Sequence, residues 1–309
     1  MKAYAKINLS LAVTGKLPDG YHFISSKMQA ISLFDDVTIE TTVTAPTSGA
    51  GIVVEMAAAP DAPDASRGKF PQGADNLAYR SAELALQLWN LGGEDTTGVR
   101  VIIRKRIPMA AGLAGGSADA AVVLLALAHM LSPKTKLGEI IKAGSAIGAD
   151  VPFCVAAAAR GNPALGFSED ATARTAALCE GIGDELSPAA PERGWVVLAR
   201  PAVDVSTPQI YSDIDDSKRS GGCRRTADRK DDNDLTQPAI ERYPLIGVVI
   251  DEVKDISGAE RVFMTGSGPT VVALYAEEVA AVRGYATLKG AYKNRADIGA
   301  VVFSKLLES

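Results

Sequence analysis

Apolar and polar side chains alternate over residues 7–14, and this two-residue period predicts a half-buried strand. Pro-Asp-Gly within 17–21 predicts a turn. Two further strands are expected over 26–33 and 36–43, joined at Phe34-Asp35. Residues 44–74 are rich in Ala, Pro, Gly, Ser and Asp around a short apolar run at 52–56, so most of this stretch is expected to be surface loop.

Helical spacing begins after residue 75. Leucines recur on one face over 76–91, where Asp75 or Asn76 is a suitable cap and Gly92 a suitable end. An apolar strand is then expected over 101–107.

Two more helices are expected beyond the loop that follows this strand. One covers 118–131 and is apolar enough to be buried on all sides, and the other covers 137–147 and is closed by Gly148. His129, in the apolar helix, is expected to be structural.

The pattern changes after Pro163, where short strands (195–199, 262–264 and 271–275) mix with helices such as 277–288. This mixed order favours an α+β fold over a doubly wound sheet. The 309 residues suffice for two domains, which we expect at 1–162 and 163–309. Residues 215–234 are charged and almost free of large apolar side chains, so they predict a surface loop.

Composition excludes several classes of protein. The formal net charge is −5, so general affinity for nucleic acid is not expected. Three Cys without zinc-type spacing suggest reduced thiols in a cytoplasmic setting, and two His exclude a multi-His metal site. No apolar run reaches membrane-spanning length. Lys6 and Asn8 interrupt the apolar start of the chain, so no signal peptide is expected.

Residues 108–120, PMAAGLAGGSADA, carry the strongest chemical signal. Three Gly and several Ala lie between a predicted strand and a predicted helix, and Ser117 is a suitable N-cap. Small residues allow close backbone approach, and a helix N-terminus directs N–H groups and a positive dipole at one point. The stretch therefore predicts an anion site, most often one for phosphate.

Two familiar phosphate loops do not fit this stretch. The spacing from Gly112 to Gly116 is one residue too short for a P-loop, and Ser117 stands where Lys is required. Gly112 is followed by Leu113 and Ala114, so the dinucleotide fingerprint fails as well.

Two other short motifs have the same character. GADVPF (148–153) places Asp150 before an apolar stretch that would partly remove it from water, as a general base requires. TGSGP (265–269) lies between two predicted strands, and its glycines again permit close backbone approach to a ligand.

Together, the three motifs resemble those of the GHMP kinase superfamily, in order and spacing. AKINLSLAVTGKLPDGYH (5–22) and NDL (233–235) further resemble members that act on a cytidine diphosphate-linked substrate of the non-mevalonate isoprenoid pathway. Pro269 departs from the Ala expected there, and 215–232 is longer than expected. The resemblance implies an N-terminal ribosomal-protein-S5-like nucleotide domain and a C-terminal ferredoxin-like domain.

The resemblance also implies transfer of the γ-phosphoryl group of ATP, with Mg²⁺, to a substrate hydroxyl. Asp150 would take the hydroxyl proton, while Lys6 would keep Asp150 ionised and stabilise developing negative charge. No residue is assigned as a metal ligand. Residues implied at ATP are Asn76, Lys105, Pro108, Met109, Ala110, Ala111, Gly112, Leu113, Ala114, Gly115, Gly116, Ser117 and Ala118.

The substrate side is implied by resemblance too. Tyr21 would stack on cytosine and His22 would hydrogen-bond to it. The other residues implied at this substrate are Asn8, Thr207, Gly266, Ser267 and Gly268.

Two alternatives remain open from the sequence. The chain could be another GHMP small-molecule kinase, of the homoserine or mevalonate type, although such kinases should lack D-G-Y-H as a cytosine site. It could also be a nucleotide-binding protein of this fold without activity, against which the presence of both Lys6 and Asp150 argues.

Overall fold

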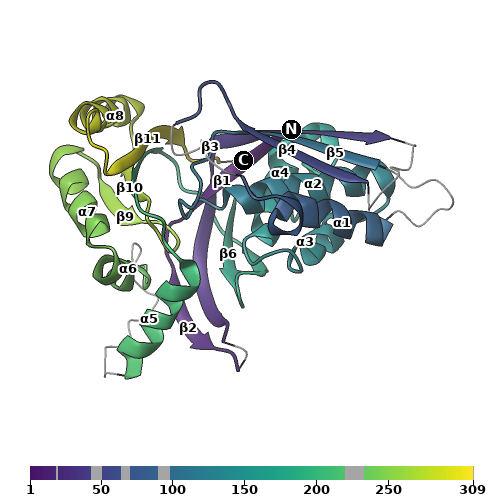
Figure 1. Cartoon of the computed structure of the whole chain (residues 1–309), viewed down its shortest axis with the longest axis horizontal. Coiled ribbons are helices and arrows are strands. Elements are labelled where there is room, and N and C mark those ends of the chain that lie inside the picture. The colour runs from purple at the N-terminus through teal and green to yellow at the C-terminus, as the bar shows by residue number, and fades with distance from the viewer. Residues whose placement is uncertain (19, 43–50, 64–69, 90–97, 220–232, 309) are drawn as a thin grey trace.

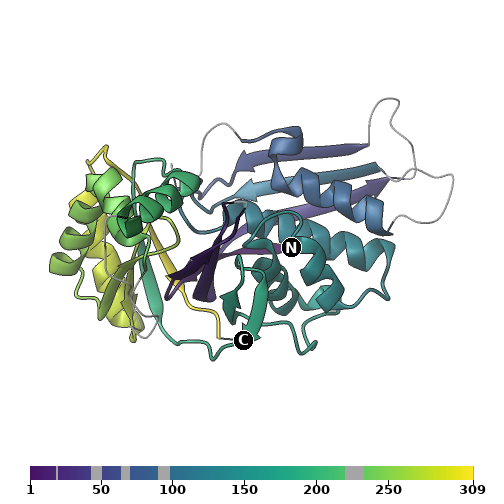
Figure 2. The ribbon, with the colours of Figure 1, turned by 90° about the horizontal axis from the view of Figure 1, so that it is seen from below.

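A computed structural model describes residues 1–18, 20–42, 51–63, 70–89, 98–219 and 233–308, with side chains described except at 42 and 215–219. Two sheets lie along the long axis of the molecule, each covered by helices (Figures 1 and 2). The architecture confirms the expected α+β class.

Within the described residues, the first sheet has seven strands and is organised around one long strand, β3 (His22–Thr42). The order is β4-β5-β3-β6-β7, and β1 and β2 also pair with β3. The bounds of the other strands are β1 (Lys2–Asn8), β2 (Ala12–Lys16), β4 (Ile52–Ala58), β5 (Gly98–Lys105), β6 (Ala176–Glu180) and β7 (Glu185–Pro188).

Two strand predictions were wrong in this region. The strands expected at 26–33 and 36–43 are one continuous strand, because Asp35 at the expected junction is fully buried with hydrogen-bonded partners. The strand expected at 7–14 is instead two strands, β1 and β2, on either side of 9–11. Its polar positions are not all solvated, since Asn8 is buried.

Helices α1 (Leu77–Trp89), α2 (Gly115–Leu131) and α4 (Val151–Gly161) pack on this sheet, and α3 (Leu137–Gly144) packs on α2 and α4. Asn76 is the cap of α1, because its Oδ1 accepts the Ala78 N–H at 2.9 Å. The expected helix end at Gly92 lies outside the described residues. α2 is buried continuously from Ala118 to Ala128, as its apolar sequence predicts, whereas α3 ends at Gly144, earlier than expected.

The second sheet has the strand order β11-β8-β10-β9. Its strands are β8 (Trp195–Pro201), β9 (Arg261–Met264), β10 (Val271–Tyr275) and β11 (Ile298–Lys305). Helices α5 (Thr207–Arg219), α6 (Thr236–Arg242) and α7 (Pro244–Ile256) follow β8, and α8 (Glu278–Tyr292) follows β10. This strand–helix–strand–strand–helix–strand sequence is the ferredoxin-like arrangement that the resemblance implies.

The pairing of strands bears on the expected division at 1–162 and 163–309. Hairpin β6–β7 follows residue 163 but pairs with β3 of the first sheet. Leu11 and Val13 of the N-terminal segment pack in the apolar core of the second sheet. The division stays a prediction, and the pairing favours a boundary between β7 and β8.

Two loop predictions are only partly covered. α5 extends to Arg219 into the stretch expected to be loop at 215–234, and 220–232 lie outside the described residues. β4 occupies the short strand expected within 44–74, and 43–50 and 64–69 lie outside. None of the helices in the described part of the chain has the length and apolar character that a membrane span requires.

Candidate active site

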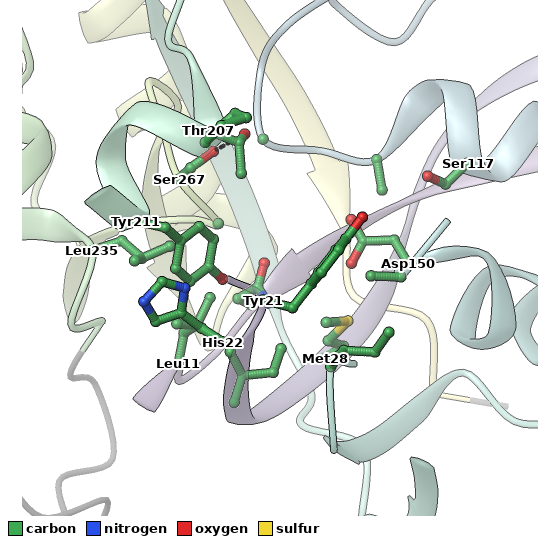
Figure 3. Close-up of a pocket in the computed structure, with 18 of the residues that line it drawn as sticks. Leu11, Tyr21, His22, Met28, Ser117, Asp150, Thr207, Tyr211, Leu235 and Ser267 are labelled. Atoms are coloured by element: carbon green, nitrogen blue, oxygen red, sulfur yellow. Dashed lines mark hydrogen bonds between the residues drawn. The ribbon is translucent and has the colours of Figure 1, made fainter. Parts of the chain in front are cut away.

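A cavity of about 720 Å³ opens between the two sheets (Figure 3). It brings together residues from each predicted motif, although these are far apart in the chain. The predicted site residues that line it are Lys6, Asn8, Tyr21, His22, Gly112, Ala114, Ser117, Asp150, Thr207, Gly266 and Ser267.

The glycine-rich loop joins β5 to α2 along one side of this cavity. Ala110, Gly112 and Ala114 have φ of 47°, 71° and 56°, so the left-handed positions fall on two alanines as well as a glycine. Each left-handed alanine costs about 1–2 kcal/mol, which the surroundings must offset. Gly115 is the first residue of α2 and has no positive φ.

The N-terminus of α2 points its N–H groups toward the loop. The N-cap is Ala114, without a side-chain cap, so the expectation that Ser117 caps the helix was wrong; Ser117 lies in the first turn. The first N–H groups of a helix have no acceptor within it. Their position beside the cavity suits a bound anion.

Contacts from both sheets hold the loop in place. The backbone N–H of Lys6 donates to the Leu113 carbonyl at 3.1 Å. A Cβ built at Gly112 would lie 2.7 Å from the Thr265 oxygen and 2.9 Å from the Gly268 oxygen. Only glycine fits there, and the phosphate loop is therefore closed against the third motif.

Lys6 and Asp150 meet where this loop borders the cavity. Lys6 Nζ lies 3.5 Å from Asp150 Oδ2, and it donates to Asn8 Oδ1 at 2.7 Å and to the Gly112 carbonyl at 3.4 Å. Lys6 is 4% exposed and the Asp150 side chain 30%. A buried cation thus stands behind a carboxylate that faces the cavity, an arrangement suited to accepting a proton.

Strand β1 and the start of helix α4 position Lys6 and Asp150 next to each other. Lys6 and Asn8 lie two residues apart on β1, so they share one face of the strand. Asp150 is the N-cap residue of α4, and Pro152 in the first turn keeps the helix start at this point.

Aromatic side chains line the part of the cavity away from the glycine-rich loop. Tyr21 is 62% exposed, and Figure 3 shows its ring within the cavity between His22 and Asp150. His22 stacks on Tyr211 of α5, with ring centroids 4.9 Å apart and planes at 26°. Burial raises the pKa of Tyr211 well above its usual range, and the charge of Asp150 raises it further.

Tyr211 was not predicted from the sequence, although a signal for it exists. It follows Thr207 by four residues and so lies on the same face of α5. Other lining residues without a prediction are Leu11, Lys16, Gly20, Ile24, Met28, Ala149, Ile182, Pro208, Ser212 and Leu235.

The third motif is held by hydrogen bonds from three other segments. Thr207 and Ser267 share a hydroxyl hydrogen bond of 2.7 Å. Asn233, in the NDL element, donates to the carbonyls of Met264 and Gly266 at 2.9 and 2.8 Å. The Asn8 N–H donates to Thr265 Oγ1 at 2.8 Å, which ties the motif to β1. Pro269, which departs from the family pattern, follows a cis peptide bond.

The remaining predicted residues do not line the cavity. They are Asn76, Lys105, Pro108, Met109, Ala110, Ala111, Leu113, Gly115, Gly116, Ala118 and Gly268. Asn76 is buried at the cap of α1, and Lys105 is buried between Asp35 and Asp119. The assignments of residues to ATP stay predictions.

The oxygen atoms on the cavity indicate whether a magnesium ion could bind there. Within the described ranges, no three His, Cys, Asp or Glu side chains gather as a metal site. Mg²⁺ in nucleotide sites commonly takes one or two protein oxygens and otherwise phosphate and water. The Ser117 hydroxyl and the Asp150 carboxylate, on one cavity, are oxygen donors of that kind.

Comparison with known proteins agrees with this geometry. Residues 76–158 match the family described as GHMP kinases N terminal domain. Fold and site together define a GHMP kinase.

Full-length relatives narrow the class further. The chain belongs to the family of 4-diphosphocytidyl-2-C-methyl-D-erythritol kinases. It is 37% identical to that kinase of Geobacter sulfurreducens over 302 residues, 92% of each chain. It is 34% identical to that of Acetivibrio thermocellus over 306 residues, 94% of each chain.

Solved structures include one of the same kinase and one that shares only the fold. A crystal structure of 4-(cytidine 5'-diphospho)-2C-methyl-D-erythritol kinase is 29% identical and superposes with a TM-score of 0.68, covering 99% of this chain and 98% of that one. The crystal structure of L. major mevalonate kinase in complex with R-mevalonate, at 16% identity and a TM-score of 0.63 over 100% of this chain and 96% of that one, shares the fold.

Proposed function

We propose that the protein transfers the γ-phosphoryl group of ATP to the 2-hydroxyl of 4-diphosphocytidyl-2-C-methyl-D-erythritol, in the non-mevalonate isoprenoid precursor pathway. One observation carries the proposal. The Lys6–Asp150 pair lies on a single cavity that has the phosphate loop on one side and Tyr21, His22 and Tyr211 on the other. Such a cavity can hold both substrates with the reacting atoms beside the pair.

Asp150 is the proton acceptor in this reaction. Its carboxylate faces the cavity, and Lys6 behind it stabilises the negative charge that develops as the hydroxyl is deprotonated. The pair is held by Asn8 and by the Gly112 carbonyl, so its geometry is set before substrates bind.

The loop from Pro108 to Ala118 receives the triphosphate of ATP. Its support is the open N-terminus of α2 and the small residues that let the backbone approach an anion. Mg²⁺ would accompany the triphosphate, with the Ser117 hydroxyl as a candidate oxygen donor, and would supply charge neutralisation. Asn76 and Lys105 are assigned to the adenosine side of this loop.

The cytidine end lies at the aromatic part of the cavity. Tyr21 presents an exposed ring for stacking, and His22 presents ring nitrogens for hydrogen bonds to the base. Tyr211, stacked on His22, supports that imidazole from the opposite side. Thr207, Gly266 and Ser267 contact the substrate between the base and Asp150, and Gly268 is assigned to the same loop behind them.

The other parts of the assignment follow from the same chemistry. Residues 1–162 carry the ATP loop and the catalytic pair, and 163–309 carry the third motif. We expect a small-molecule substrate, neither nucleic acid nor membrane as partner, and a cytoplasmic enzyme; the oligomeric state is left open.

The test is direct phosphorylation by the purified chain. It is incubated with ATP, Mg²⁺ and, separately, the cytidine diphosphate-linked substrate, homoserine or mevalonate, and the product is identified by ³¹P NMR. We expect a new phosphomonoester signal with the cytidine substrate alone. Turnover of mevalonate or homoserine in its place would assign the chain to another GHMP activity, and ATP binding without turnover of any would leave a non-catalytic nucleotide-binding protein.

A further inference from the structure

A buried group of three ionisable side chains lies beneath the glycine-rich loop, outside the cavity. Lys105 Nζ contacts the Asp35 carboxylate of β3 and lies 2.6 Å from Asp119 Oδ2 of α2. All three residues are at most 3% exposed. Burying two carboxylates with one ammonium is weak support for stability in itself, so this triad of Asp35, Lys105 and Asp119 points to another role.

The triad connects the two ends of the loop. Lys105 is the last residue of β5, before the loop, and Asp119 follows the loop in α2. Asp35 Oδ1 also accepts the backbone N–H groups of Arg106 and Ile107, the latter at 2.9 Å. The start of the loop is therefore fixed to β3, and its end is fixed through the same ammonium.

The loop needs such support because of its backbone. Ala110 and Ala114 keep left-handed conformations that persist only when the surroundings over-determine them. Lys105 lies directly below the helix start, since a Cβ built at Gly115 would be 3.4 Å from its Nζ. Asp119 Oδ1 is buried without a hydrogen-bond partner in the described structure. The position of this carboxylate is therefore not explained by its own hydrogen bonding.

We propose that Asp35 and Asp119 are positioning residues for phosphoryl transfer, which act through Lys105 to hold the loop in the conformation that receives ATP. They touch neither substrate. The inference rests on the proposed role of the loop as the ATP site. Without the triad the loop populates other conformations, and the apparent affinity for ATP falls with the competent fraction.

The test compares Asp119→Asn with a matched surface variant, Asp61→Asn. Asp61 pairs with Arg106 at the start of the same loop, but its side chain is 68% exposed and it lies outside the triad. For Asp119→Asn we expect the Kd of ATP by calorimetry and the KM for ATP to rise about tenfold, as for a tenfold loss of the competent state. The KM for the cytidine substrate stays unchanged, and Asp61→Asn leaves all three values unchanged.

Equal rises in both KM values, or a lower melting temperature with unchanged ATP affinity, would overturn the proposal. Asp35→Asn removes the same ammonium contact from the other side and must reproduce the selective loss of ATP affinity. Failure of both variants to fold would make the triad a determinant of the fold and equally overturn it. If the unaltered chain binds ATP without phosphorylating the cytidine substrate, the proposed function fails, while the calorimetric comparison still decides on the triad.

Discussion

The ammonium group of Lys6 lies 3.5 Å from Oδ2 of Asp150, with a strand on one side of the pair and the start of a helix on the other. Lys6 is oriented from within the protein by Asn8, whereas Asp150 faces the cavity. Charge stabilisation and proton transfer are therefore assigned to separate side chains, whose loss should have separable effects.

Replacing Asp150 by Asn should abolish most turnover while both substrates still bind. The amide keeps the shape of the carboxylate but cannot accept the proton, and loss of a general base costs about 10²–10⁴ in rate. Steady-state kinetics should show the loss in kcat, with calorimetry showing retained ATP affinity. Asp170→Asn, at an exposed carboxylate that contacts Thr172, is the matched control. A near-normal kcat would make Asp150 a structural residue.

Gly112→Ala should weaken ATP binding and lower thermal stability. The new Cβ would lie 2.7 Å from the Thr265 oxygen at a φ of +71°, so the loop or the third motif must move. The control is Gly138→Ala, where nothing lies within 4 Å and a helical Ala stabilises by up to about 1 kcal/mol. Calorimetry and thermal unfolding distinguish the two. Unchanged ATP affinity in Gly112→Ala would remove this loop from the nucleotide site.

Gly115→Val should also abolish ATP binding in a folded protein. The reason is contact and not φ, because a Cβ at Gly115 would lie 3.0 Å from Ile107 Cγ2. The helix start must then shift away from its present place beside the cavity. Normal ATP affinity of this variant by calorimetry would contradict the proposed use of the helix N-terminus.

Tyr21→Ala should raise the KM for the cytidine substrate by roughly ten- to a hundredfold, since base stacking on an aromatic ring contributes about 1–3 kcal/mol. The KM for ATP should hardly change, and Tyr21→Phe should restore most of the loss because the ring makes the contact. Phe23→Ala is the control, because this ring is 39% exposed and does not line the cavity. Equal changes in both KM values would indicate a disturbed cavity, and no change would remove the basis for choosing this substrate.

Cys154 and Cys179 should resist alkylation in the folded protein. Burial raises the pKa of the Cys179 thiol to about 12 and that of Cys154 well above its usual range, and Asp150 adds to both effects. Mass spectrometry after iodoacetamide treatment at pH 8 should find both unlabelled, and both labelled in urea. Thiols in the unfolded chain ionise near pH 8.5, whereas these two stay protonated in the folded protein to a higher pH. The stability that the two buried thiols contribute should therefore be lost as the pH rises from about 8.5 toward 12. Rapid labelling of the native chain at either position would contradict the burial.

Many residues of the candidate site were predictable because they lie in short motifs that can be recognised from residue type and spacing. The loop at 108–118, the GADVPF carboxylate and the TGSGP turn were each found from residue type and spacing, and the cavity brings them together. What the sequence could not supply was the set of contacts between distant segments. Nothing local to Asp35 indicates that it accepts N–H groups from Arg106 and Ile107.

The errors have a common physical origin. The strand junction at Phe34-Asp35 and the half-buried strand over 7–14 were inferred from polarity, since polar residues are usually exposed. In this protein those polar side chains are buried because partners on other elements satisfy them. The cap at Ser117 was inferred from residue type, but the left-handed Ala114 begins the helix earlier.

Strand β3 runs without interruption from His22, at the cytidine end of the cavity, to Asp35, below the phosphate loop, and beyond it. Successive residues of a strand point to opposite faces, so one inserted or deleted residue between them would turn one end over relative to the other. The residue proposed to bind the base and the residue proposed to support the nucleotide loop thus lie on one strand, and the number of residues between them fixes their relative orientation. Among relatives, this segment should keep a constant length while the chain outside it varies.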